Sequence, residues 1–435
     1  MGKDPKTTAE NQLKKAEQLY KARQFKKAGK NFHSAGISFL KLEEYEIAKN
    51  CFLEAIKPFL ELDKYDTILE LIRKASEACL QNDQYSEAFR LYKDTMNHIP
   101  KLKSETDKNY NYILFSVLSY LCLHANGAPE EGLDYIKRNR NKIDNDVFKE
   151  NNLIQLISEL TLSLRDKTEK YLENIQNNLN QFKLRDPEVK LLKDVILLTK
   201  FQLLIESSLI LDKDTYTTND IINLNVELDT NPLIQVVNNS FFKLKINSFQ
   251  IIKLIVSLSD NLTTNKKPDV PFSLDIGSKI TLPFTLKPHF QLDNPKIGPI
   301  NLTFELNNLL IFNYDTSVII PNLISPPASL EASIKNLRPP LLDQSFPLEI
   351  LIENRSQGEA LDVNIDVEFP EELKLMRGTT NKQIYSLRSN ENLKWEVNLK
   401  PLDVGDFIIK INIKFKDPDD NQINDVKEFP FSIKM

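Results

Sequence analysis

Glycine and histidine are scarce in this sequence, with 10 glycines and four histidines among 435 residues. A backbone that approaches phosphate groups closely needs glycine. Neither GxGxxG nor GxxxxGK followed by Ser or Thr occurs, which excludes the common nucleotide-binding loops. HExxH and CxxC are also absent, and the histidines are scattered along the chain. The sequence therefore predicts no catalytic residues, no cofactor and no metal site of recognisable spacing.

Cysteine is also rare, and long apolar runs are missing. The three cysteines, Cys51, Cys79 and Cys122, lie in apolar helical patterns, so we expect buried free thiols rather than disulfides. The N-terminal residues lack the apolar stretch of a secretory signal. The most apolar long segment, 195–211, is interrupted by two charged residues, which argues against a membrane-spanning helix. These features predict a cytoplasmic protein that could associate only peripherally with membranes.

A repeat of twenty residues fills most of the first hundred positions. Aromatic residues recur at Phe25, Tyr45, Tyr65 and Tyr85, and apolar residues follow each of them at alternating steps of three and four. That spacing places the apolar residues on one face of an α-helix. The polar segments between units are long enough only for a tight turn. Each unit is therefore predicted to be one helix, and successive units to pack as antiparallel hairpins that stack into a solenoid.

The repeat also predicts which residues form the core. Phe32, Phe52 and Ile72 occupy the same position in three successive units, so Phe52 is expected between the other two. Beyond residue 104 the helical pattern continues without a clear period. Pro129 and Pro187 are expected near the starts of two helices, where proline is favoured. Five further helices are predicted: 112–123, 132–137, 153–164, 171–182 and 189–211.

The small and large residues of the repeat resemble a known family. The pattern Ala-x3-Phe-x2-Ala at Ala28, Phe32 and Ala35 recurs twenty residues later and resembles the second helix of a tetratricopeptide repeat, although the Trp and Leu-Gly of that repeat's first helix are missing. The two helices of each predicted hairpin are equal in length and longer than those of a tetratricopeptide repeat, which looks more like the related soluble NSF attachment protein (SNAP) family. The resemblance covers about residues 7–100 and implies a helical solenoid. Since SNAP-like repeats occur in membrane-trafficking adaptors, it also implies a role in trafficking or vesicle tethering.

After about Thr218 the apolar residues change to a period of two, which predicts β-strands. Alternation begins at 242–246, continues through the segments that follow, and is cleanest at 361–369. One apolar and one polar face per strand is typical of antiparallel sandwiches. Two such domains are expected, separated by a linker at 321–327 (PNLISPP).

The last predicted domain also resembles a known module. Trp395 on an inner strand, and the run 402–406 (LDVGD) before a long strand, resemble immunoglobulin-like modules of the cell-adhesion-related type. The predicted fold class is thus an N-terminal α-solenoid of helical hairpins followed by two antiparallel β-sandwich (Ig-like) domains. The expected domains are SNAP/tetratricopeptide-like repeats at 1–103, an irregular continuation of the solenoid at 104–218, a first β-sandwich at 219–325 and a C-terminal Ig-like sandwich at 328–435.

Charge is the surface feature that suggests a binding site. The chain has a net charge of −5, without the strongly basic balance of a nucleic-acid-binding domain. Residues 14–30 are a local exception, with seven basic side chains against Glu17 alone. They are predicted either to form a solvated helix face or to contact an acidic partner or an anionic membrane surface. These candidate contact residues are Lys14, Lys15, Lys21, Arg23, Lys26, Lys27 and Lys30.

Two other candidate sites have plainer interpretations. In residues 417–421 (DPDDN) every second side chain carries an oxygen that could bind calcium, as in an EF-hand loop. However, Gln422 stands where an EF-hand has glycine. A solvated hairpin turn is therefore predicted there. His33 lies beside the apolar stripe of its helix and is predicted to be a partly exposed structural residue.

The leading functional hypothesis is a non-enzymatic scaffold or adaptor that binds other proteins through the solenoid surface and the sandwich edges. Neither nucleic acid nor a small-molecule substrate is expected. Two alternatives stay open: a hydrolase-type enzyme with a site at the junction of solenoid and sandwich, and a cell-surface adhesion protein. The scarcity of glycine and histidine in motif contexts argues against the first, and the missing signal segment argues against the second.

Overall fold

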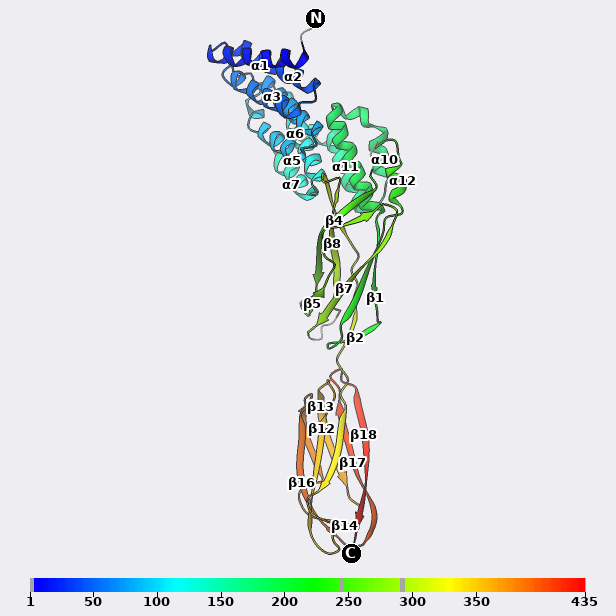
Figure 1. Cartoon of the computed structure of the whole chain (residues 1–435). Coiled ribbons are helices and arrows are strands. Elements are labelled where there is room, and N and C mark those ends of the chain that lie inside the picture. Colours follow the sequence, from blue (N-terminus) through cyan, green and yellow to red (C-terminus); the bar gives the residue numbers. More distant parts are fainter. Residues whose placement is uncertain (1–3, 243–245, 290–293, 435) are drawn as a thin grey trace.

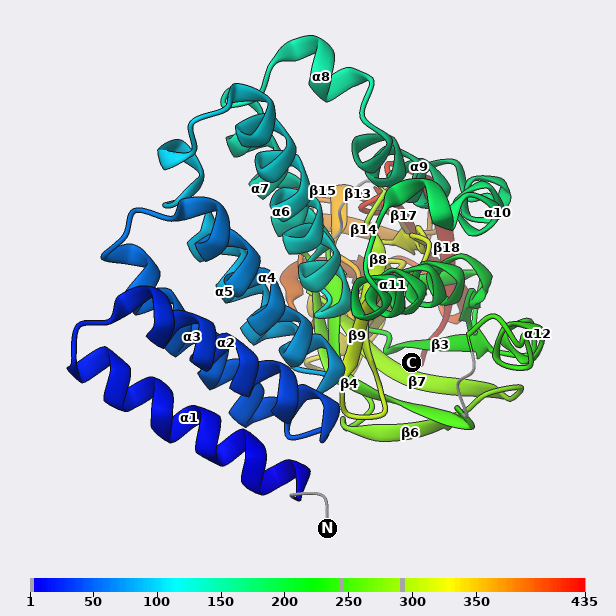
Figure 2. The same ribbon diagram turned by 90° about the horizontal axis from the view of Figure 1, so that it is seen from above.

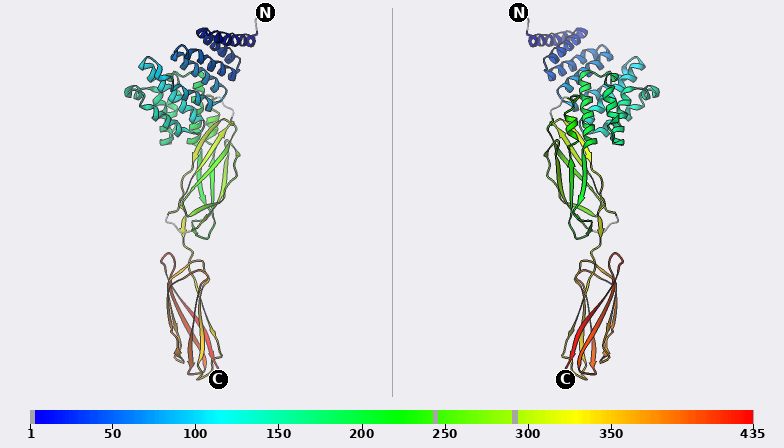
Figure 3. Two further views of the ribbon diagram at one scale, coloured as in Figure 1. Left: turned by 90° about the vertical axis from the view of Figure 1, so that its left-hand side faces the viewer. Right: turned by 90° about the vertical axis from the view of Figure 1, so that its right-hand side faces the viewer.

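The computed structural model describes residues 4–242, 246–289 and 294–434. Helices fill the described chain up to Leu204, and strands dominate from Glu206 onward. The helical region, a first β region and a second β region follow one another along one long axis, and the two chain termini lie at opposite ends (Figure 1, Figure 3). The predicted order of a helical part followed by a β part is confirmed.

The twenty-residue repeat is confirmed as a series of helices. Each aromatic of the repeat is the first residue of its helix, because the polar segment before it turns the chain. Neighbouring helices in the series pack against one another, with the first helix at the outer end (Figure 2). The helices are α1 (Pro5–Lys21), α2 (Phe25–Lys41), α3 (Tyr45–Leu60), α4 (Tyr65–Gln81) and α5 (Tyr85–Thr95).

Small residues let these helices approach closely. Phe52, at the centre of the stripe, is fully buried, as predicted. An added Cβ at Gly36 would lie 2.6 Å from the Phe52 ring, and one at Gly29 would lie 2.5 Å from the Phe59 ring. The two glycines of α2 and the two phenylalanines of α3 have the same spacing along their helices, so both rings fit against the same face of α2.

Each turn between these helices contains one residue in the left-handed backbone conformation. The next residue then donates its N–H to a carbonyl of the preceding helix, as Glu44 does to Phe39 at 3.0 Å. Glycine usually makes this closure, and the turns here form without it. The left-handed residues stand two positions before each aromatic, with φ between 50° and 60°: Arg23, Glu43, Asp63 and Asp83.

Helices continue beyond the repeat at all five predicted positions. Pro129 and Pro187 lie in the first turns of their helices, as predicted. The α-helices are α6 (Glu105–Ala125), α7 (Pro129–Arg140), α8 (Asn145–Lys149), α9 (Asn152–Asp166), α10 (Lys170–Asn177) and α11 (Asp186–Leu204). Two short 3₁₀ helices also occur, η1 (Ile99–Lys101) before α6 and η2 (Leu179–Phe182) before α11.

The last predicted helix, 189–211, is too long. Helix α11 ends at Leu204, and the following residues form strand β1 (Glu206–Leu211). Every second residue of β1 is partly buried, but six residues of alternation do not stand out beside a long apolar helix. The change from helix to strand therefore comes earlier than the predicted position near residue 218.

The first β region contains two four-stranded antiparallel sheets, with strand orders β1-β3-β7-β5 and β6-β4-β8-β9. A short helix, α12 (Leu233–Val237), follows β3 in the chain. The strand predicted at 242–246 includes 243–245, which lie outside the described residues. Besides β1, the strands of these two sheets are β3 (Ile222–Asp229), β4 (Ser248–Leu258), β5 (Leu262–Lys266), β6 (Phe272–Asp275), β7 (Lys279–Pro288), β8 (Ile297–Leu306) and β9 (Leu310–Asp315).

The predicted linker at 321–327 is partly a strand. Strand β10 (Asn322–Ile324) pairs in parallel with β2 (Thr215–Thr217) and so belongs to the first β region. The pairing joins segments 107 residues apart, which local sequence patterns do not reveal. The connection to the second β region is therefore shorter than predicted.

The second β region has a hydrophobic core of its own. Its two four-stranded antiparallel sheets have the orders β11-β12-β16-β14 and β15-β13-β17-β18, and both contribute buried residues. Trp395 belongs to this core and lies on β16, an inner strand as predicted. The strands are β11 (Leu330–Asn336), β12 (Phe346–Asn354), β13 (Ala360–Glu368), β14 (Leu373–Arg377), β15 (Asn381–Leu387), β16 (Asn392–Pro401), β17 (Gly405–Lys416) and β18 (Gln422–Ile433).

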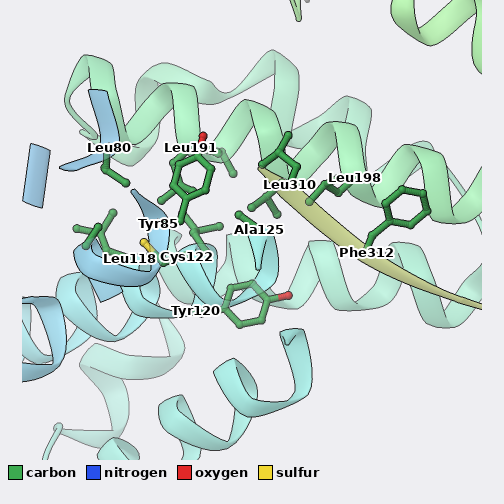
Figure 4. Packing of buried hydrophobic residues seen from close by; sticks show 14 of the residues in the cluster. Leu80, Tyr85, Leu118, Tyr120, Cys122, Ala125, Leu191, Leu198, Leu310 and Phe312 are labelled. Carbon is green, nitrogen blue, oxygen red and sulfur yellow. The ribbon is translucent and has the colours of Figure 1, made fainter. Parts of the chain in front are cut away.

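The helical region and the first β region, in contrast, share one hydrophobic core. Helices α6 and α11 pack against β9. The ring of Phe201 in α11 lies 6.2 Å from that of Phe249 and 6.0 Å from that of Phe312, measured between centroids. Figure 4 shows Leu191 and Leu198 of α11 in the same cluster as Phe312. The change of hydrophobic period therefore marks a change of secondary structure inside one packed unit.

The three cysteines are buried and free, as predicted. Burial raises the pKa of the Cys51 thiol to about 11 and that of Cys79 to about 12. Both thiols therefore stay protonated at neutral pH, and a protonated thiol is a poor nucleophile.

Candidate functional site

The seven basic side chains of residues 14–30 are all exposed on α1, on α2 and in the turn between them. Among the described residues, none of the seven takes part in an ion pair, although Lys6 of α1 pairs with Glu44 at 2.9 Å. Basic residues on later helices pair with acids one turn away, as Lys57 does with Glu54 at 2.6 Å. The outer end of the array therefore carries unbalanced positive charge.

A cavity of about 470 Å³ opens between α2 and α4. Its three α2 residues are spaced four and three apart, which is one face of the helix. Phe59, Leu62 and Leu71 give the cavity apolar walls, and exposed lysines surround them. The lining residues are Lys26, Lys30, His33, Phe59, Leu62, Lys64, Thr67, Glu70 and Leu71.

The cavity has a positive balance because the acid in its lining is already neutralised. Glu70 accepts a hydrogen bond from Arg185 at 2.7 Å, and its second oxygen lies 3.7 Å from the Lys74 ammonium nitrogen. The three lysines of the lining form no ion pair with any residue that the structure describes. Ammonium groups around apolar walls suit a ligand that has both negative charge and an apolar group.

His33 is partly exposed in the wall of this cavity, which agrees with its predicted position. Its ring centroid lies 5.9 Å from that of Phe52. Burial, together with the positive charge of Lys74, lowers the pKa of His33 below its ordinary value. The imidazole is therefore neutral at neutral pH and adds a hydrogen-bonding group rather than a charge to the cavity.

The basic run at 14–30 includes two of the cavity lysines, Lys26 and Lys30, but not Lys64. The structure brings these three together, whereas the other five basic residues of 14–30 do not line the cavity. The repeat could have predicted that Lys64 lies near Lys26 and Lys30. Helices two units apart lie on the same side of an antiparallel array, so the first turns of α2 and α4 share one face.

Comparisons with known proteins assign no family, because neither a family model nor a curated protein matches the chain. Among the described residues, no helix combines the length and the apolar character that crossing a membrane requires. Function therefore has to be inferred from the surfaces and cavities of the chain itself.

A wider cavity of about 820 Å³ lies where the helical region meets the turn between β8 and β9. A hydrolase with a site at this junction would use it. Most of its charged side chains pair with one another: the Lys49 nitrogen lies 2.5 Å from Glu46 and 4.0 Å from Glu87, and Arg90 also pairs with Glu87. Among the described residues, its lining includes Ser86 but no histidine or cysteine. It therefore lacks the common pairing of a serine or cysteine nucleophile with a histidine base.

Residues 417–421 form a turn between β17 and β18, as predicted, but Asp417 at its start is buried rather than solvated. The Asp417 carboxylate accepts hydrogen bonds from the backbone N–H groups of Asp419 at 3.0 Å and Asn421 at 2.9 Å. Glu428 would stand at the twelfth position of an EF-hand loop that begins at Asp417; it lies on β18 and pairs with Lys410 at 2.9 Å. Within the described ranges, no three His, Cys, Asp or Glu side chains are grouped so that they could hold a metal ion. The two hydrogen bonds to the Asp417 carboxylate stabilise the hairpin.

Buried ion pairs tie α11 to α4. Arg73 donates two hydrogen bonds to Glu188, at 2.7 and 2.6 Å, and Glu188 is fully buried. Glu188 also accepts from the backbone N–H of Arg185 at 2.9 Å, which caps α11. The Arg185 side chain reaches Glu70 at 2.7 Å and also pairs with Glu77. The network joins segments 115 residues apart and positions one wall of the α2–α4 cavity through Glu70.

Helix α11 has a second buried polar contact, in which Tyr85 donates to the Asp194 carboxylate at 2.7 Å. Burial raises the pKa of Asp194 from its ordinary value of 3.8 to about 6, although the bond from Tyr85 favours the charged form. The folded state therefore holds the Asp194 proton more tightly than the unfolded state does.

We expect Asp194→Asn to change the pH dependence of stability. The free energy of unfolding of wild type should fall by about 2 kcal/mol through this group as pH rises from about 4 to about 6, since the folded state must release a proton that it prefers to keep. Asparagine still accepts from Tyr85 but does not titrate, so the variant should gain stability relative to wild type over that range. Urea titrations between about pH 4 and about pH 7 would measure this gain. A difference that stays constant with pH would contradict the assignment.

Proposed function

We propose that this chain is a non-enzymatic interaction scaffold, an adaptor whose basic end docks on an acidic protein surface. The observation that carries the proposal is the unbalanced charge of α1 and α2, where residues 14–30 have seven basic side chains and one acid. Solubility of an end helix needs charge of either sign. A face of one sign suits a partner of the opposite sign.

The architecture supports a scaffold role. We infer that the helices form a solenoid of the tetratricopeptide or SNAP-like type, which offers an extended surface, and that the sheets form Ig-like sandwiches, which offer edges. The helical region and the second β region lie at opposite ends of the molecule (Figure 3), so one chain could hold two partners apart. The SNAP-like resemblance leads us to propose membrane trafficking or vesicle tethering as the setting.

Charge reversal at the basic end is expected to abolish docking. Each change to glutamate replaces attraction by repulsion at an exposed position, so wild type should retain acidic proteins that the variant loses when the tagged full chain is purified and analysed by mass spectrometry. High salt should have the same effect, because the screening length falls from about 8 Å at physiological ionic strength to about 3 Å at 1 M. The changes are Lys14→Glu, Lys15→Glu, Lys26→Glu and Lys27→Glu in one protein.

A control variant makes the same charge change on exposed lysines elsewhere in the helical region and should retain the acidic proteins. Identical protein sets from wild type and both variants would contradict the proposal. Co-sedimentation with phosphatidylserine vesicles and with neutral vesicles tests the membrane alternative. Anionic vesicle binding that only the basic-end variant loses would favour membrane docking instead. The control changes are Lys93→Glu, Lys101→Glu, Lys103→Glu and Lys149→Glu.

A further inference from the structure

We propose that the cavity between α2 and α4 binds an acidic peptide segment that carries one large apolar side chain. This inference rests on the proposed scaffold function and names the partner chemistry of one site at the basic end. Two properties of the cavity carry it independently: its apolar walls and its uncompensated lysines.

The apolar walls give the site its anchor pocket. Phe59 is 8% exposed and Leu71 is 2% exposed, and together with the half-buried Leu62 they line a volume of about 470 Å³. The volume has room for a side chain and its adjoining backbone. Because Gly29 has no side chain, α2 packs directly on the Phe59 ring and holds it in the wall. Such a wall gains free energy when an aliphatic or aromatic group replaces water against it.

The lysines set the charge of the ligand. Lys26 and Lys30 stand on α2, and Lys64 stands across the cavity at the start of α4. Arg185 and Lys74 already neutralise the one acid of the lining, so the positive charge is available to a ligand. A peptide with carboxylates on both sides of an apolar residue meets the lysines of both helices at once.

The same geometry favours a peptide over an anionic lipid surface. The apolar walls lie between two helices, and exposed lysines stand beside them. A lipid in a bilayer would contact the lysines through its headgroup but would keep its acyl chains in the membrane, so the apolar walls would stay unused. An apolar side chain on an acidic peptide uses both parts of the site.

Fluorescence anisotropy with the purified full chain tests the proposal. The probe is a labelled peptide with one leucine flanked on each side by aspartates. Replacing that leucine by alanine should weaken binding to wild type by about tenfold to thirtyfold, because apolar contact is lost. Replacing the aspartates by asparagine should abolish measurable binding.

Two triple variants with the same change in net charge separate the cavity from general attraction. Lys26→Glu, Lys30→Glu and Lys64→Glu change the cavity and should weaken peptide binding about tenfold or more. The matched control, built from basic residues outside the cavity, should weaken it less than about threefold, because those side chains are farther from the bound peptide. The control changes are Lys14→Glu, Lys15→Glu and Lys21→Glu.

A third variant tests the apolar part alone. Thr67→Trp places a large ring in the cavity and leaves every lysine in place, so the leucine and alanine peptides should then bind equally. Circular dichroism checks that each variant is folded. The comparison of the two peptides on wild type needs no variant, so the proposal can fail even if a variant does not fold.

The outcomes distinguish this inference from the proposed function. Equal losses in the two triple variants, or equal affinity of the leucine and alanine peptides for wild type, would overturn the cavity proposal while leaving a charged docking face. The basic-end variant changes Lys26, which lines the cavity, together with three lysines outside it, so its loss of acidic partners tests the scaffold and does not by itself test the cavity. Absence of peptide binding, together with phosphatidylserine vesicle binding that depends on the three cavity lysines, would overturn the peptide in favour of a membrane.

Discussion

Glu188→Ala is expected to lower the free energy of unfolding by about 3–5 kcal/mol. The change leaves the guanidinium of Arg73, a residue that is only 8% exposed, without its counter-charge. It also removes the oxygen that accepts the backbone N–H of Arg185 and caps α11. Because α11 packs against both α4 and β9, the loss should weaken the core that the helical and first β regions share. Denaturant titration followed by circular dichroism measures the effect.

A double variant provides the matched comparison. Arg73→Met with Glu188→Leu removes both charges and keeps apolar volume, so it should cost less than Glu188→Ala alone. Glu173→Ala removes an exposed carboxylate from α10 and should change stability by no more than about 0.5 kcal/mol. If Glu188→Ala and Glu173→Ala were equally stable, the buried ion pair would not hold α11 in place.

Phe52→Ala is also expected to cost about 3–5 kcal/mol, because the fully buried ring leaves a cavity between α2 and α3. Gly36→Ala should destabilise as well, since its new methyl group would lie 2.6 Å from the Phe52 ring. Combined, the two changes should cost less than the sum of their separate effects, because the methyl group enters space that the ring has left. Thermal and denaturant unfolding of the three variants measure the coupling.

The control for this series is Glu61→Ala, an exposed change at the end of α3 that should fall within about 0.5 kcal/mol of wild type. Glu43 is a poorer choice, although it also lies in a turn, because its φ of 60° makes the outcome depend on the replacement residue. Strictly additive costs for Gly36→Ala and Phe52→Ala would show that the two residues do not meet as described.

The repeat helices could be predicted closely because their signal is local. Steps of three and four residues bring Ala28, Phe32 and Ala35 onto one face, whatever that face later packs against. The aromatic at the start of each unit, such as Tyr45, also marks the first residue of its helix. For the same reason the burial of Phe52 followed from its position in the repeat.

The β regions were predicted less completely, because strands pair across distance and tolerate irregular positions. Asp362 has a φ of 49°, and the register of β13 on β17 shifts between Leu361 and Asn364. Ala360 is consequently buried, whereas Leu361, the first apolar residue of the alternation at 361–369, is only partly buried. An insertion of one residue into a strand moves every later side chain to the other face, and periodicity alone does not locate it.

The candidate site shows the same division. The sequence by itself determined that the charged side chains of residues 14–30 are almost all positive, because charge is a property of the residues present. It also determined where most of the helices lie, because helical spacing depends on neighbours three and four positions apart. Lys26 and Lys30 were therefore found from the sequence, but the apolar walls beside them were not.

Only the tertiary structure decided which of these charges meet a cavity and which acids are buried. Lys64 joins the cavity because α2 and α4 lie on the same side of the array. From the sequence, Glu188 is only an acidic residue in the first turn of a helix. In the structure it is fully buried against Arg73, which lies 115 residues away in the chain. Local patterns fix the face of a helix but not the partner of that face, since the partner depends on how distant helices stack.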